Sequence, residues 1–193
     1  MPHRSHALTL VQFSVAFIPF GVLLVVAMIW PETTEDPNLN RTLATIWAAS
    51  VLLGAALVIY PFRNASEGAN NLASLFWTFA WVVFLAHAYW AIFLVYYGIA
   101  DTWREMGPTI AGANFFLTIW WSADVVLGWA IGREPRWLSW AHLAARTFIF
   151  LVFAVTLLFL RGGAAQYLGV AFAGTVLLAL AARILADVRS APA

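Results

Sequence analysis

The sequence predicts an all-α protein, a bundle of about six membrane-spanning helices joined by short loops. Apolar residues make up 63% of its 193 residues and charged residues only 10%, against about 45–50% and 25% in soluble domains. Six apolar stretches also approach or exceed the roughly 20 residues that a helix needs to cross a hydrocarbon core of about 30 Å. We therefore expect residues 1–193 to form one integral membrane domain, with the lipid bilayer around it.

The predicted spans cover residues 8–30, 42–60, 72–99, 108–131, 142–160 and 165–186. Pro31, Pro61 and Pro108 stand at span boundaries, where a helix start or stop is expected. Gly162 and Gly163 predict a tight turn before the last span. The third span is the longest, so it should tilt or protrude from the bilayer.

Arginine placement predicts the orientation in the membrane. All ten basic residues are arginine, and with the abundance of alanine and tryptophan this favours a GC-rich bacterial origin and hence the inner membrane. Six arginines fall on the side of the two termini and three on the opposite side, so both termini should be cytoplasmic. The first apolar stretch lacks an Ala-x-Ala cleavage signal and is expected to be retained as a helix.

Several function classes are disfavoured by what the sequence lacks. With no cysteine, disulfides, iron–sulfur clusters and cysteine-based zinc sites are excluded. The net charge of +1 gives no reason to expect nucleic acid, and no P-loop or dinucleotide fingerprint predicts a nucleotide. The short loops cannot build a soluble active site, so an independent enzyme is not favoured.

Ionisable side chains inside a bilayer cost several kcal/mol unless they are paired. Helical rise places five of them in one layer near the predicted cytoplasmic face: Asp124, Arg146, His142, Arg183 and Asp187. Asp124 and Arg146 would neutralise each other, and Arg183 and Asp187 are spaced for an i, i+4 pair. Two interpretations stay open: the pairs lock the last three helices together, or they line a proton or ion route or bind an anionic headgroup.

A second polar layer contains His87 and Asn114. His87 has three interpretations: a hydrogen bond across helices, for instance to Asn114, axial ligation of haem iron or chlorophyll magnesium, or proton relay. In the second, His87 is the metal ligand, and Trp90 and Asn114 complete the predicted cofactor site. His142 lies roughly 20 Å away in height, so the two histidines should not share one haem.

Eleven tryptophans are many for a chain of this length. Five fall well inside the third and fourth spans: Trp77, Trp81, Trp90, Trp120 and Trp121. We expect them to face lipid, and the alternative is an aromatic wall around a quinone or a pigment.

Small residues predict close helix contacts. They recur in the sixth span at Ala165, Gly169, Ala173 and Ala181, and more briefly in the second at Ser50 and Gly54. No convincing repeat relates the two halves of the chain, which counts against a transporter built from duplicated units.

These observations predict a small accessory or scaffolding subunit of a bacterial energy-converting complex, respiratory or photosynthetic, with other membrane subunits as partners. It would contact a quinone, a haem or a chlorophyll-type pigment near His87. The alternative is a small transporter or proton-conducting protein that uses the polar layer of Asp124, Arg146 and His142. An intramembrane enzyme acting on a lipid or isoprenoid ranks third, because the acidic and histidine clusters of a metal site are missing.

Overall fold

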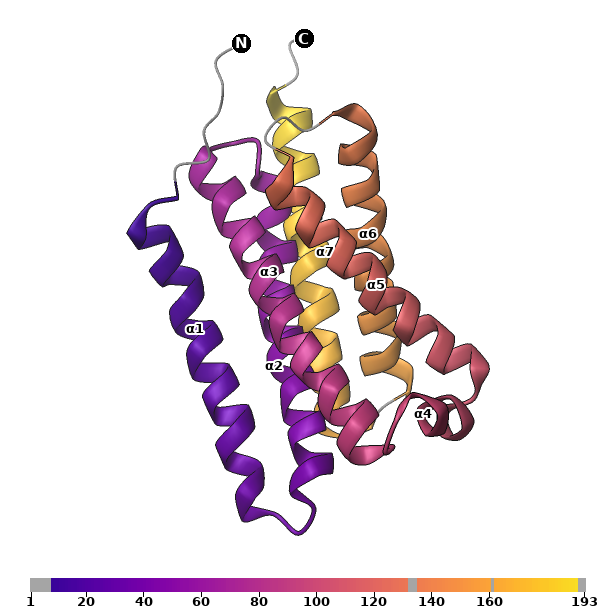
Figure 1. Ribbon diagram of the computed structural model, residues 1–193. Helices are drawn as coiled ribbons and strands as arrows, with labels where there is room; N and C mark the ends of the chain where they lie inside the picture. The colour runs from indigo at the N-terminus through magenta and orange to yellow at the C-terminus, as the bar shows by residue number, and fades with distance from the viewer. Residues whose placement is uncertain (1–7, 132–134, 161, 191–193) are drawn as a thin grey trace.

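The computed structural model describes residues 8–131, 135–160 and 162–190, and within them it contains seven α-helices and no strand (Figure 1). Six helices, with the short segments that prolong some of them, are long and apolar enough to cross a membrane. The all-α, multi-pass fold predicted from the sequence is therefore confirmed.

The helices are α1 (Leu10–Ile29), α2 (Pro37–Ile59), α3 (Glu67–Tyr89), α4 (Ile99–Met106), α5 (Pro108–Ala130), α6 (Arg136–Val155) and α7 (Ala164–Ser190). Short 3-10 turns follow α1 and α2, and π-helical segments prolong α3 and α6: η1 (Trp30–Thr33), η2 (Tyr60–Phe62), η3 (Trp90–Val95) and η4 (Thr156–Leu160). We call the end at which α1 begins and α7 ends the upper end of the bundle, and the end that carries α4 the lower end (Figure 1).

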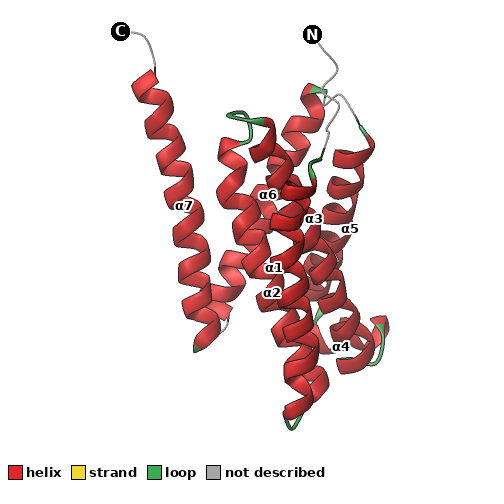
Figure 2. Ribbon diagram, turned by 90° about the vertical axis from the view of Figure 1, so that its left-hand side faces the viewer, coloured by secondary structure: helices red, strands yellow, loops and turns green. Residues whose placement is uncertain are grey.

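Helices α2 and α3 form the centre of the bundle and make its most extensive helix–helix contact. Small side chains in α2 allow this approach, since Ala48, Ala49 and Ala56 are all nearly fully buried. Half of the most apolar window of the α2 span is buried within the protein, against 11% for the spans of α1 and α7. Helices α1 and α7 are therefore peripheral, as Figure 2 shows for α7, and most of their surface is left for lipid.

The small-residue ridges are used inside the chain. A Cβ atom on Gly169 of α7 would lie 2.8 Å from the Leu157 Cβ, so the α7 backbone packs directly on η4. A Cβ on Gly54 of α2 would lie 3.3 Å from Cδ2 of Phe172 in α7. The ridges thus hold α7 against α2 and against the end of α6.

Three helices begin earlier than predicted, at Pro37, Glu67 and Arg136 rather than at 42, 72 and 142. The first turns of α2 and α3 are polar and lie outside the apolar runs, so hydropathy alone does not detect them, whereas α6 begins with the mixed sequence Arg-Trp-Leu-Ser. Asp36 accepts a hydrogen bond from the Leu39 N–H, and Ser66 accepts one from the Ala69 N–H. These N-caps satisfy backbone donors that would otherwise stay unpaired at the helix start.

The third span ends at Val95 rather than at residue 99. Tyr97 and Gly98 have φ angles of 61° and 139°, which no helix can contain, and the chain then enters α4. The span from Glu67 to Val95 still has 29 residues and is the longest of the six.

Two of the deep tryptophans lie in the protein core. Trp77 is 3% exposed and Trp121 0%, with their rings 5.0 Å apart, and Trp121 also stacks on Phe84. The prediction that they face lipid is wrong for this pair, because the central helices leave room for large rings that interlock.

Candidate functional site

A buried carboxylate, that of Asp124 in α5, lies toward the upper end of the bundle and is 5% exposed. His142 Nδ1 donates to its Oδ1 at 2.5 Å, and Trp77 Nε1 donates to its Oδ2 at 2.9 Å. Arg146 Nη1 lies 3.4 Å from Oδ2. The structure thus places Asp124 beside Arg146, as the sequence suggested, and adds His142 and Trp77 as partners. We call these four residues the Asp124 cluster.

Arg146 is held by aromatic faces as well as by the carboxylate. Its guanidinium carbon lies 4.3 Å from the centroid of the Tyr60 ring and 4.7 Å from that of Trp77. Such contacts are worth about 2 kcal/mol when they are removed from water. Nη1 also donates to the His142 carbonyl oxygen one turn earlier in α6, at 3.1 Å. The charge is therefore fixed in place and shielded from lipid.

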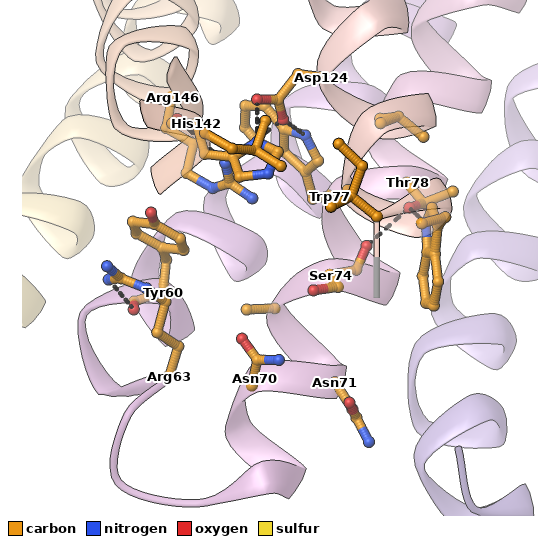
Figure 3. Close-up of a pocket in the computed structure, with 16 residues that line it drawn as sticks. Tyr60, Arg63, Asn70, Asn71, Ser74, Trp77, Thr78, Asp124, His142 and Arg146 are labelled. Atoms are coloured by element: carbon orange, nitrogen blue, oxygen red, sulfur yellow. Dashed lines mark hydrogen bonds and ion pairs between the residues drawn. The ribbon is translucent and has the colours of Figure 1, made fainter. Parts of the chain in front are cut away.

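A partly open cavity of about 90 Å³ extends from the Asp124 cluster toward the upper end of the bundle, which lies toward the bottom of the view in Figure 3. Its walls come from η2 and the turn after it, the first three turns of α3, the last turns of α5 and the first turns of α6. The lining residues are Tyr60, Arg63, Asn70, Asn71, Ala73, Ser74, Trp77, Thr78, Asp124, Val125, Gly128, Trp129, Ile131, Leu138, His142 and Arg146. Its size suits several water molecules or a small solute, since drug-sized ligands need about 300–1,000 Å³.

The lower side of the cluster is filled by aromatic side chains. Trp121, Phe84 and Phe153 lie in contact with one another, with ring centroids 5.4–6.0 Å apart in the three pairs, and all are buried. We call these three residues the aromatic layer. The aromatic layer follows directly on Trp77, whose ring contacts that of Trp121, and it therefore separates the Asp124 cluster from the lower end. The cavity reaches the cluster from the upper end.

The other predicted pair of the polar layer stands apart from this site. Arg183 Nη2 and Asp187 Oδ1 are 2.8 Å apart on α7, with side chains 34% and 57% exposed. Neither residue lines the cavity. The polar layer predicted from helical rise thus consists of a buried cluster between α3, α5 and α6 and a separate surface pair on α7.

His87 lies nearer the lower end, where its Nδ1 donates to the Thr42 carbonyl oxygen of α2 at 2.8 Å. Trp90 packs against Arg41, whose guanidinium carbon is 4.9 Å from the ring centroid, and Arg41 is ion-paired with Glu32. The backbone carbonyl of Asn114 accepts a hydrogen bond from the Thr118 hydroxyl. Neither His87, Trp90 nor Asn114 lines the cavity at the Asp124 cluster.

The two intramembrane histidines lie at opposite ends of α2. His87 contacts Thr42, whereas the His142 side of the bundle contacts Tyr60 through Arg146. Eighteen residues separate Thr42 from Tyr60, which is about 27 Å along a helix. This agrees with the expectation that the two histidines do not share a haem.

A haem or chlorophyll at His87 stays a prediction. An Nδ1–H donated to a carbonyl is the arrangement that orients a ligating imidazole, while no group of three His, Asp or Glu residues in the described ranges is placed to hold a metal ion. If a pigment binds, protein purified from its native membranes will show a Soret or red absorption band that His87→Ala removes. A spectrum containing only tryptophan absorption would contradict the cofactor.

Sequence reasoning did not identify Trp77, Tyr60 and Arg63 as site residues. The depth of Trp77 does not by itself predict its partner: a buried indole N–H usually finds an acceptor, and here Asp124 accepts it. Tyr60 begins η2 and Arg63 follows it, and nothing in their local sequence indicates that Tyr60 contacts Arg146 or that both residues line the cavity.

Comparison of the chain with protein-family models, with curated proteins and with solved structures finds no match.

Proposed function

We propose that this chain is a small membrane transporter that binds a solute and a proton in the cavity beside the Asp124 cluster. One observation carries the proposal. Asp124 and His142, joined by a hydrogen bond of 2.5 Å, are buried within the spanning helices and also line a cavity that extends to the upper end. A pair that served only to join helices would need no such cavity.

The pair is chemically suited to proton binding. Histidine gains and loses a proton between pH 5 and 8 more readily than any other unperturbed side chain, and the His142 imidazole is hydrogen-bonded to the Asp124 carboxylate. Arginine keeps its charge, so each proton taken up by His142 changes the charge beside the cavity by one. Such a change alters the affinity for a charged solute and thereby couples the two binding events.

Transport also requires that the cavity opens to the other side of the membrane. The aromatic layer of Trp121, Phe84 and Phe153 closes the lower side of the cluster. In the alternating-access scheme, it would separate when the helices that form the cavity move against one another. The helices concerned are α3, α5 and α6.

We further propose that the protein lies in a bacterial inner membrane with the upper end in the cytoplasm. Arg63 lies at the upper end beside the cavity, and two arginines near the lower end are paired within the described residues, Arg41 with Glu32 and Arg104 with Asp101. The excess of arginine on the side of the termini supports this orientation.

The role of accessory subunit in an energy-converting complex stays a prediction. Two features that motivated it are used inside the chain: Gly169 packs on η4, and Trp77 and Trp121 fill the core. Blue-native migration of the gently solubilised protein at its monomer size would contradict it, and comigration with other membrane proteins would favour it over an independent transporter.

The transporter proposal predicts proton flux that depends on Asp124. When a filtrate of small bacterial metabolites is added outside, an imposed pH gradient should decay at least tenfold faster in proteoliposomes than in empty liposomes. Asp124→Asn should return the rate of proton flux to that of empty liposomes, because it removes the carboxylate that is hydrogen-bonded to His142 at the cavity wall. Asp187→Asn is the matched control, since this carboxylate lies on α7 outside the cavity. Wild-type flux equal to that of empty liposomes, or full flux in Asp124→Asn, would contradict the proposal.

A further inference from the structure

The charges that line the cavity are unbalanced. Its lining residues include two arginines, Arg63 and Arg146, but a single carboxylate, that of Asp124. With His142 neutral the lining carries a net charge of +1, and with His142 protonated it carries +2. An excess positive charge held in a low-dielectric region attracts an anion strongly.

Arg63 supplies the excess charge. Its Nη1 donates to the Tyr60 carbonyl oxygen at 3.3 Å, and its guanidinium carbon lies 4.0 Å from the Tyr60 ring centroid. Within the described ranges it forms no ion pair. Its side chain is half-buried and contributes to the wall of the cavity, so its charge is only partly screened by bulk water.

The two arginines are close together because they share one ring. Their guanidinium carbons lie 4.0 Å and 4.3 Å from the Tyr60 centroid, so they can be no more than 8.3 Å apart, the sum of these distances. Two like charges at this separation repel each other in a partly buried site. In Figure 3 the two side chains lie on opposite sides of Tyr60, so an anion in the cavity would reduce this repulsion through its attraction to both charges.

Uncharged hydrogen-bonding groups complete the cavity wall. Asn70 and Ser74 of α3 lie across the space from Tyr60 and Arg63 in Figure 3. An amide and a hydroxyl can each donate to an oxyanion without adding charge. Asn71 is used elsewhere, since its Nδ2 donates to Gln12 of α1 at 3.0 Å.

We infer that the cavity binds an oxyanion, a phosphate or carboxylate group, at the wall to which Arg63 and Arg146 contribute their charges. This inference rests on the proposed function, for which it names the class of solute. The cavity of about 90 Å³ admits one such group and little more. Two sources have this chemistry, a free anion such as inorganic phosphate and the headgroup of an anionic lipid.

The first arm of the test is titration calorimetry of the full-length protein in mild detergent with inorganic phosphate, at constant ionic strength against chloride. Binding is expected to be saturable and to weaken at least tenfold in Arg63→Gln. Arg104→Gln is the control and should bind within twofold of the wild type, because Arg104 is 77% exposed on α4. Arg63→Lys keeps the charge but not the fork and should bind with intermediate affinity, which separates loss of the site from misfolding.

The second arm counts phosphatidylglycerol molecules retained by the protein in native mass spectrometry, after transfer from phosphatidylcholine nanodiscs with and without that lipid. Retention that Arg63→Gln abolishes, without phosphate binding, would assign the site to a lipid headgroup. If the wild type binds neither probe, or if Arg63→Gln binds as tightly as the wild type, the inference is overturned. Neither arm uses a gradient, so anion binding without proton flux would refute only the proposed function, and flux without anion binding only this inference.

Discussion

Asp124→Asn is expected to lower the melting temperature of the detergent-solubilised protein by about 10 °C. Removing one partner of a buried ion pair costs about 3–5 kcal/mol, and each kcal/mol lowers the melting temperature of a chain of this size by about 2–4 °C. The substitution leaves Arg146 charged between Tyr60 and Trp77 and removes the carboxylate that accepts from His142. Thermal unfolding followed by circular dichroism measures the change.

Asp187→Asn provides the comparison for this result. Its carboxylate is also paired with an arginine, but both side chains are substantially exposed, so the loss should stay within about 1 kcal/mol. The double variant Asp124→Asn/Arg146→Gln should be less destabilised than the two single losses combined, because each removes the same contact. Unchanged melting in Asp124→Asn would show that the cluster contributes nothing to stability.

Gly169→Ala is expected to destabilise the protein by about 1–3 kcal/mol, the usual effect of excess volume in a packed interior. The added Cβ would lie 2.8 Å from the Leu157 Cβ and 3.0 Å from the Leu157 carbonyl carbon. Backbone atoms cannot move aside as a flexible side chain can, so α7 must shift away from η4. Thermal unfolding in detergent measures the effect.

Gly174→Ala is the matched control in the same helix. A Cβ at Gly174 would meet nothing within 4 Å, so this substitution should be neutral or stabilising by up to about 1 kcal/mol through helix propensity. Equal melting temperatures for the two variants would contradict the close packing of α7 on η4.

The class of fold and the number of spans could be predicted from the sequence because the bilayer imposes a length and a composition on each helix. The helix ends could not be placed as well. Capped polar turns such as the one after Ser66 lie outside the apolar runs, and the left-handed Tyr97 gives no hydropathy signal.

The candidate site could be predicted in part. Helical rise brings Asp124, Arg146 and His142 to similar heights, and the cost of an unpaired charge in lipid favours a contact between them. Which faces of the helices meet depends on packing, so the parts taken by Trp77 and Tyr60 required the structure. The sequence separation of Arg183 and Asp187 predicted their contact on α7, but not their position outside the cavity.

Solute and proton binding beside Asp124 both require that the cavity is open to water from the upper end of the bundle. The chain has no cysteine, so Ser74→Cys would place a single thiol in the cavity wall and Ser50→Cys a single thiol in the dry core, where Ser50 is 1% exposed. In sealed vesicles, a membrane-impermeant maleimide should label Ser74→Cys only from the side of the termini and should not label Ser50→Cys from either side. If the folded Ser74→Cys variant is not labelled from either side, the cavity is closed to water, and the proposed function is contradicted.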